Sequence, residues 1–297
     1  MDIGVALPTM AAGYDRSTTL DWSAGIDAGP FSSISCGERI TFRNVEMMVT
    51  LSAAAALTER VKVFVNLVVA PFHPPAVAAK ELATLDLLSD GRVVVGVGVG
   101  GREHDYRAIS ARFDHRWGRM DEQVATMRSI WAGEPPFAGA DPVGPPPVQE
   151  GGPPFVAGVM GPKALARAAR WAVGVDDGGT VFGIDADAVT ASFDRVRAAW
   201  SDAGRSDPPH LSVSLWYALG DGAADRLRDY GYAYMRIMGE ELASAMAGGL
   251  SAHTPDALAE AVGTLEELGC DELFLVPTTA DVAELDRTRD ALARWLP

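Results

Sequence analysis

Two histidines are placed where they could transfer protons. His73, in "PFHPP", comes just after an apolar run over 61–69, and His104, in "GREHDY", follows a glycine-rich run with Glu103 beside it. An imidazole changes its charge near neutral pH, so either side chain could act as a general acid or base. The alternative for both is an ordinary loop residue in contact with water.

The stretch "GRVVVGVGVGGREHDY", residues 91–106, contains the sequence motif of a dinucleotide-binding turn. Gly96, Gly98 and Gly101 form G-x-G-x-x-G, whose glycines normally make the first βα turn and open directly into a helix. Here three predicted strands precede the glycines, and the next helix is expected only from residue 116. The sequence therefore disfavours a dinucleotide-binding loop.

We instead predict a strand over 92–100, in which Gly96, Gly98 and Gly100 share one face. A bare face lets a flat ligand or a neighbouring backbone approach closely. The ligand interpretation is favoured because the glycines reach the carboxyl end of the strand, where barrel enzymes keep their active sites. The alternative is that small residues relieve crowding inside the sheet.

A second pair of glycines offers an anion site. In "GVMGPKALARAAR", Gly158 and Gly161 precede a predicted helix whose first turn contains Pro162. The free N–H groups at a helix N-terminus attract anions. We therefore predict phosphate binding here, with a simple tight turn as the alternative.

Composition and motifs exclude several classes of function. The formal charge of −15 repels nucleic acid and anionic lipid. The absence of C-x-x-C, H-E-x-x-H and G-x-S-x-G motifs leaves a metal hydrolase or a serine hydrolase without support. Cys36 and Cys270 are too few and too far apart for a disulfide framework. "MDIGVALPTM" lacks the basic start of a signal peptide, and we expect a cytoplasmic protein that contacts no membrane.

Segments typical of strands alternate with helical segments along the chain. The predicted strands cover 3–8, 31–38, 61–69, 92–100, 153–158, 173–178, 210–220 and 270–277. About eight repeated β-α units favour a (β/α)8 TIM barrel, an α/β fold, in a single domain over 1–297. A doubly wound sheet is the alternative.

One segment interrupts the alternation. Residues 133–154, "GEPPFAGADPVGPPPVQEGGPP", are rich in proline and glycine and have no apolar period. A long irregular loop in a compact domain is commonly functional or disordered. It is either a connection through solvent or a lid beside the site.

The order of these segments resembles the bacterial luciferase-like oxidoreductases, which use a flavin or the deazaflavin F420. The resemblance rests on five blocks in sequence: "GVALPT", "FSSISCGER", "AAAALTERVKVFVNLVVAPFHPPAVAAKELATLDLLSDGRVVVGVGVGGRE", "FDHRWGRMDEQVATMRSIWAGEPPF" and "PPFVAGVMGPKALARAARWAVG". It implies a (β/α)8 barrel with an insertion and a cofactor at the carboxyl ends of the strands.

The resemblance also implies which residues hold the cofactor ring. Relatives often have a non-prolyl cis peptide in the third strand, and counting back from Pro71 places it here at Leu67-Val68. The ring would lie against this peptide and against Gly98 and Gly100.

The cofactor phosphate would lie at the start of the "GPKALARAAR" helix. The resemblance places it against Gly158, Met160 and Gly161. This is the same segment for which the free N–H groups at the helix N-terminus predict phosphate binding.

F420-using relatives often carry an acidic residue and then a histidine after the second strand. Here the pair is Glu38-Arg39. Because a guanidinium does not deprotonate in proteins, Arg39 cannot replace that histidine as an acid. It could hold an anionic group with two hydrogen bonds, or form a surface pair with Glu38. His73 is a candidate for the proton transfer, although relatives often place their histidine one position later, where this chain has Pro74.

The resemblance implies hydride transfer between F420, which is narrowly favoured, or FMN and a small organic substrate. One alternative is an FMN-dependent monooxygenase that receives reduced flavin from a separate reductase. Another is a non-catalytic flavin-binding protein. We also expect a homo-oligomer, because apolar helices such as 44–58 could pair across an interface.

Overall fold

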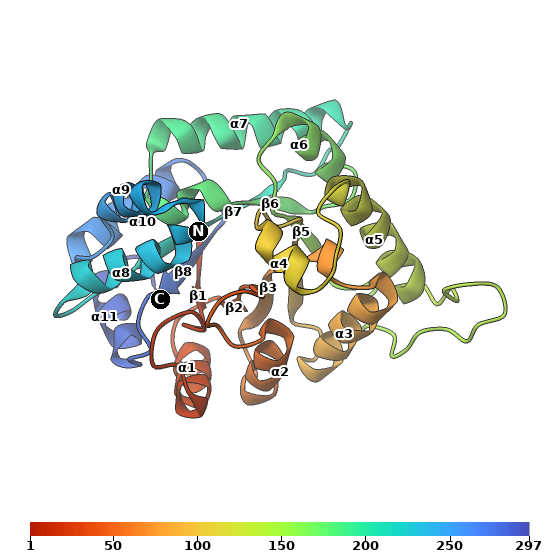
Figure 1. Ribbon diagram of the computed structural model, residues 1–297, viewed down its shortest axis with the longest axis horizontal. Coiled ribbons are helices and arrows are strands. Elements are labelled where there is room, and N and C mark those ends of the chain that lie inside the picture. The colour runs from red at the N-terminus through yellow and green to blue at the C-terminus, as the bar shows by residue number, and fades with distance from the viewer. Residues whose placement is uncertain (297) are drawn as a thin grey trace.

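The computed structural model describes residues 1–296, in which eight parallel strands close into a barrel (Figure 1). The strands are β1 (Asp2–Ala6), β2 (Ser33–Cys36), β3 (Lys62–Val69), β4 (Val93–Gly98), β5 (Phe155–Ala157), β6 (Gly174–Asp177), β7 (His210–Tyr217) and β8 (Glu272–Pro277). Each strand pairs with the next, and β8 returns to β1. The predicted TIM barrel is confirmed, and the doubly wound sheet is excluded because that sheet has two open edges.

Figure 1 shows the helices arranged around the outside of the strands. They are α1 (Arg16–Ala28), α2 (Met47–Leu57), α3 (Pro75–Leu88), α4 (Glu103–Ala108), α5 (Arg116–Trp131), α6 (Pro162–Ala168), α7 (Ala186–Asp202), α8 (Ala223–Met235), α9 (Glu240–Gly248), α10 (Pro255–Glu267) and α11 (Ala283–Ala291). Three short 3₁₀ turns are η1 (Ala70–Phe72), η2 (Gly178–Phe182) and η3 (Arg236–Met238).

The barrel strands are apolar where they meet helices and partly polar inside. β3, "KVFVNLVV", has the near-continuous apolar sequence expected of a parallel strand covered on both faces. Inside the barrel the buried Glu272 accepts a hydrogen bond of 2.7 Å from the Ser33 hydroxyl and lies 3.4 Å from Nε2 of His210. These polar partners compensate the cost of burying a carboxylate.

Two local expectations are corrected near the glycine-rich strand. β4 ends at Gly98, so Gly100 lies beyond the strand, where its φ of +60° is one that glycine adopts without strain. A short helix, α4, occupies residues that were expected to be irregular before residue 116. Its short run had no long apolar period by which to recognise it.

The proline-rich segment 133–154 lies at the amino-terminal end of the barrel. Gln149 donates hydrogen bonds to the buried Asp86 (2.7 Å) and to the carbonyl of Val93 at the start of β4 (2.8 Å). No residue of 133–154 lines the cavity described below. The lid alternative is therefore wrong, because a loop from a helix to the next strand returns the chain to the end opposite the carboxyl ends of the strands.

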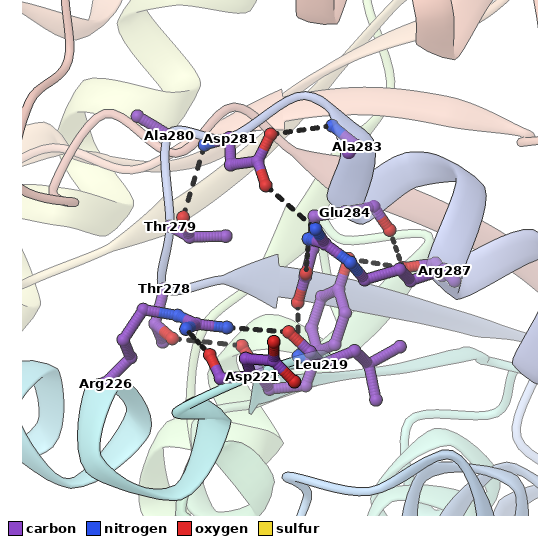
Figure 2. Close-up of polar contacts among 12 residues, drawn as sticks. Leu219, Asp221, Arg226, Thr278, Thr279, Ala280, Asp281, Ala283, Glu284 and Arg287 are labelled. Atoms are coloured by element: carbon purple, nitrogen blue, oxygen red, sulfur yellow. Dashed lines mark hydrogen bonds and ion pairs between the residues drawn. The ribbon is translucent and has the colours of Figure 1, made fainter.

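At the carboxyl ends of β7 and β8, a polar network joins two loops (Figure 2). The buried Glu284 accepts hydrogen bonds from the Leu219 N–H (2.5 Å) and from Arg287 (3.0 Å). Arg226 on α8 donates to the carbonyls of Leu219 (2.6 Å) and Asp221. The network ties α8 to the barrel and so positions the aromatic side chains that α8 contributes to the site.

Within residues 1–296 no helix is both long and apolar enough to cross a bilayer. The same residues contain no group of three or more histidine, cysteine or acidic side chains that could hold a metal ion.

Candidate active site

A cavity of about 370 Å³ opens at the carboxyl ends of the strands. Barrel enzymes carry their active sites at this end. Residues from strands, helices and loops that are far apart in sequence meet there, including Met10, Glu38, Arg39, Leu67, Phe72, Gly100, Arg102, Asp105, Asp176, Trp216, Tyr230 and Tyr234.

The floor of the cavity contains a non-prolyl cis peptide at Asn66-Leu67. The expected position, Leu67-Val68, was wrong by one residue. The pairing of β3 with β4 is interrupted between Val65 and Val68, so the irregularity begins earlier than the count back from Pro71 placed it. Leu67 lines the cavity, whereas Val68 is buried outside it.

The glycines of β4 make room for Leu67 rather than directly for a ligand. A Cβ atom on Gly98 would lie 2.7 Å from Cδ1 of Leu67, and one on Gly158 would lie still closer to Cδ2. Neither glycine lines the cavity, while Gly100 and Gly101 do. The prediction that a ligand lies directly against Gly98 was therefore wrong, because the side chain of Leu67 on the neighbouring strand fills that space.

Glu38 and His73 form a close pair. Nε2 of His73 lies 2.7 Å from Oε1 of Glu38, while Oε2 accepts a hydrogen bond of 2.7 Å from the Val69 N–H. Burial alone would lower the pKa of His73, but the hydrogen bond to Glu38 and the charges of Glu38, Glu81 and Glu46 outweigh it and raise this pKa. Glu38 lines the cavity and His73 stands behind it, partly exposed.

Arg39 is a buried cavity residue and does not pair with Glu38 at the surface. Its Cζ lies 4.4 Å from the ring centroids of both Phe42 and Tyr234. Its Nε is 3.6 Å from Oδ2 of Asp105, and Nε of Arg102 is also 3.6 Å from that oxygen. The position expected to hold a proton donor is thus occupied by a permanently charged group.

The remaining predicted residues are not brought into this cavity. His104 is exposed on α4, although its neighbour Asp105 is buried in the cavity wall. Met160 is exposed and lines a second cavity of about 220 Å³, and Gly161 precedes α6. Neighbouring residues line the two cavities at the end of β6, Gly178 the first and Gly179 the second.

Sequence reasoning missed Asp176 on β6. Its carboxylate is buried at the cavity floor and accepts a hydrogen bond of 3.1 Å from the Ser212 hydroxyl. Burial raises the pKa of Asp176 to about 7, opposed by Ser212 and assisted by the charges of Asp177 and Glu272. The available signal was an acidic residue inside a short buried strand, "GVDD", which needs a partner.

The lining fits a flat heteroaromatic ring with a polar edge. Asn66, Ser214 and Asp176 supply donors and acceptors at the floor, and the walls are apolar and aromatic. The buried Ser35 hydroxyl also lines the cavity and has no hydrogen-bond partner within residues 1–296. A flavin or deazaflavin ring has both features, with an apolar face and an edge of carbonyl and N–H groups.

The chain is similar in sequence to the two following proteins. It is 27% identical over 223 residues to the uncharacterized protein Rv0953c of Mycobacterium tuberculosis, covering 68% of this chain and 77% of that protein. A shorter stretch of 92 residues is 37% identical to an FMNH2-dependent dimethylsulfone monooxygenase of Pseudomonas putida, covering 30% of this chain and 25% of that protein.

Among solved structures, an F420-dependent secondary alcohol dehydrogenase in complex with an F420-acetone adduct has the same fold. Its TM-score is 0.79 at 17% identity, with 99% of each chain covered. Residues 1–292 match the luciferase-like monooxygenase family, and the chain belongs to that family.

Proposed function

We propose that this protein is an oxidoreductase that transfers hydride between F420, or FMN, and a small organic substrate. The observation that carries the proposal is the cavity at the carboxyl ends of the strands, where Asn66, Leu67 and the acidic Glu38 line one space. When bound, the cofactor supplies the hydride chemistry, while the protein supplies binding and orientation.

The ring would lie over Leu67 and beside Gly100, with its polar edge toward Ser35 and Asn66. The side chain of Leu67 would set the height of the ring, because Gly98 and Gly158 leave it space below. The phosphate would extend toward Gly158, Met160 and Gly161, and the second cavity, which Met160 lines, supports this direction.

Glu38 and His73 would donate or accept the proton that accompanies hydride transfer. Glu38 lines the cavity, and its Oε1 atom lies 2.7 Å from Nε2 of His73. The His73 side chain is partly exposed to solvent. A carboxylate between a cavity and an exchangeable imidazole can pass a proton inward or outward. The pair would thus carry out the proton transfer that Arg39 cannot.

F420 is the favoured cofactor, since the acidic residue of the F420-type pair is present as Glu38. The first alternative is an FMN-dependent monooxygenase supplied by a separate reductase, which the match to the Pseudomonas putida monooxygenase favours. The second is a non-catalytic flavin-binding protein, since the expected histidine is replaced by Arg39.

The test is titration of the purified protein with F420 and with FMN, followed by absorbance and fluorescence. Binding of F420 and turnover of its reduced form with an organic acceptor are expected. Preferential binding of reduced FMN with oxygen uptake would favour the monooxygenase. Binding without turnover would favour the non-catalytic protein, and binding of neither cofactor would reject the proposal.

We further propose a homo-oligomer formed through α2. Its exposed face carries an apolar stripe at Val49, Ala53, Ala56 and Leu57, with Val49 72% exposed. Such a continuous apolar face is more favourable when covered than when left in water. A cytoplasmic location is proposed because both cysteines are free thiols.

A further inference from the structure

Arg39 is a buried cation whose hydrogen-bonding capacity is unused. Its side chain is 4% exposed, and Nε, Nη1 and Nη2 have no hydrogen-bond partner within residues 1–296. A guanidinium carries five N–H donors and cannot become neutral by losing a proton. Buried donors of this strength are normally satisfied, so a partner outside the chain is indicated.

The rings of Phe42 and Tyr234 stabilise the charge without supplying acceptors. Each ring centroid lies 4.4 Å from Cζ of Arg39, a distance at which an aromatic ring attracts a cation. A ring has no lone pair aligned with an N–H group in the way that a carboxylate has. The aromatic contacts therefore explain why the charge is tolerated and leave the need for an acceptor.

Arg39 and Arg102 have only one nearby carboxylate between them, because the oxygens of Glu38, the other acid beside Arg39, are held by His73 and the Val69 N–H. Arg39 and Arg102 approach the same oxygen of Asp105, each at 3.6 Å. The other oxygen of Asp105 accepts hydrogen bonds from the backbone N–H of Thr41, at 2.8 Å, and from its hydroxyl. Two guanidinium groups thus share one carboxylate that is already engaged.

The positive charge of Arg39 also affects the pKa of Arg102. Its pKa is lowered, first by burial and then by the charge of Arg39, while Asp105 opposes the shift. Arg102 also donates a hydrogen bond of 3.3 Å to the Tyr234 carbonyl and lines the cavity. One added negative charge would relieve the repulsion between the two arginines.

We propose that Arg39 and Arg102 bind a carboxylate of the substrate, which makes the substrate a small organic acid. This inference rests on the proposed function, because it places the acid in the cavity that would hold the cofactor. A planar carboxylate matches the paired N–H groups of a guanidinium. Two guanidinium groups that share the single carboxylate of Asp105 suit a monoanion, and the walls formed by Trp216, Tyr230 and Tyr234 suit an apolar remainder.

The attraction is local, because the whole chain carries a formal charge of −15 and would repel anions at a distance. The selectivity for an acid is therefore expected to depend on Arg39 and to be insensitive to arginines outside the cavity. Arg43 provides the matched control. Its Cζ lies 5.6 Å from the same Phe42 ring, but its side chain is exposed and does not line the cavity.

The test compares carboxylates with neutral amides of the same shape by calorimetry on the full chain. Benzoate and hexanoate are titrated against benzamide and hexanamide, with and without saturating cofactor. The acids are expected to bind about tenfold more tightly or better, as charged hydrogen bonds provide. Equal affinity of acid and amide in the unaltered protein would overturn the proposal.

Three variants assign the effect to Arg39. R39Q is expected to remove the preference for the acid, whereas R43Q keeps it. D105N removes the competing carboxylate and is expected to strengthen acid binding, which keeps the test valid if R39Q folds poorly by circular dichroism. Equal effects of R39Q and R43Q, or weaker acid binding in D105N, would contradict the assignment.

A second arm distinguishes a substrate carboxylate from the cofactor phosphate. FMN and riboflavin are titrated into the unaltered protein and R39Q. The proposal expects R39Q to change both affinities equally. If R39Q weakens FMN alone and benzoate competes with FMN, the anion site belongs to the cofactor. If no flavin or F420 binds while the acid preference remains, the proposed function fails and the anion site of Arg39 stands.

Discussion

Glu38 and His73 meet at the carboxyl ends of neighbouring strands, with Nε2 of His73 2.7 Å from Oε1 of Glu38. Glu38 follows β2, and His73 follows the short η1 turn after β3. The pairing joins a residue in the cavity wall to one with a path to solvent. It gives the site a titratable group although Arg39 stands where a histidine was expected.

Replacing Glu38 by glutamine is expected to reduce turnover strongly. The amide keeps the size of the side chain but cannot accept the transferred proton, and loss of a general acid or base costs roughly 10²- to 10⁴-fold in rate. The measurement is kcat with saturating cofactor, alongside cofactor affinity. His115→Gln, an exposed histidine outside the cavity, is the control. Undiminished kcat in E38Q would remove Glu38 from the mechanism.

The pair should also make stability depend on pH in a defined direction. The pKa of His73 is raised in the folded protein, so its contribution is complete below the ordinary histidine value of about 6.5 and is lost as pH rises through the raised value. We expect His73→Gln to lower Tm more at pH 6 than at pH 9. An equal loss at both pH values would show that the charge of His73 does not stabilise the fold.

Asp176 should produce a pH dependence of its own. Its folded pKa of about 7 exceeds the ordinary value of 3.8, so the folded state holds an extra proton and stability falls as pH rises between these values. The loss is about 1.4 kcal/mol for each unit by which the pKa is raised. The free energy of unfolding, measured with urea at pH 5 and pH 8, should change less in Asp176→Asn than in the unaltered protein.

The groups facing Asp176 are the Ser212 hydroxyl, Asp177, Glu272 and His210. Asp177→Asn is the matched control because it leaves the Asp176 carboxylate in place. It should retain most of the slope between pH 5 and pH 8. A slope in Asp176→Asn as steep as that of the unaltered protein would show that another group titrates.

Adding one methyl group at Gly98 should disturb the cavity through Leu67. The new Cβ would lie 2.7 Å from Cδ1 of Leu67, and overpacking of this kind costs about 1–3 kcal/mol. Gly98→Ala is expected to lower both Tm and cofactor affinity, and Leu67→Ala in the same chain should relieve part of the strain. Gly101→Ala, with no atom within 4 Å of its Cβ, should keep its Tm.

The proposed interface on α2 can be tested with two matched substitutions. Ala53→Glu places a charge on the apolar stripe of α2, whereas Ala191→Glu places one on the exposed face of α7. Light scattering after size-exclusion chromatography should show dissociation of the oligomer in the first variant only. A monomeric unaltered protein, or an oligomer that survives Ala53→Glu, would contradict an interface at α2.

The fold was predictable because its signals are local and repeated. Apolar strand segments such as 61–69 and 270–277 alternate with helices that end at glycine or begin at proline, and parallel strands with helical crossovers close readily into a barrel. Short elements were the exception. α4 has only six residues, too few for an apolar period to distinguish it from a loop.

The sequence by itself determined the barrel, the family resemblance and the end of the barrel at which Glu38, Arg39 and Leu67 lie. Only the tertiary structure decided their partners. His73 pairs with Glu38 across 35 positions, Arg39 meets Tyr234 from α8, and Leu67 rather than a ligand occupies the space beside Gly98. The physical reason is that strand order and secondary structure depend on local patterns, whereas side-chain contacts depend on register, rotamer and loop path between segments that are distant in sequence.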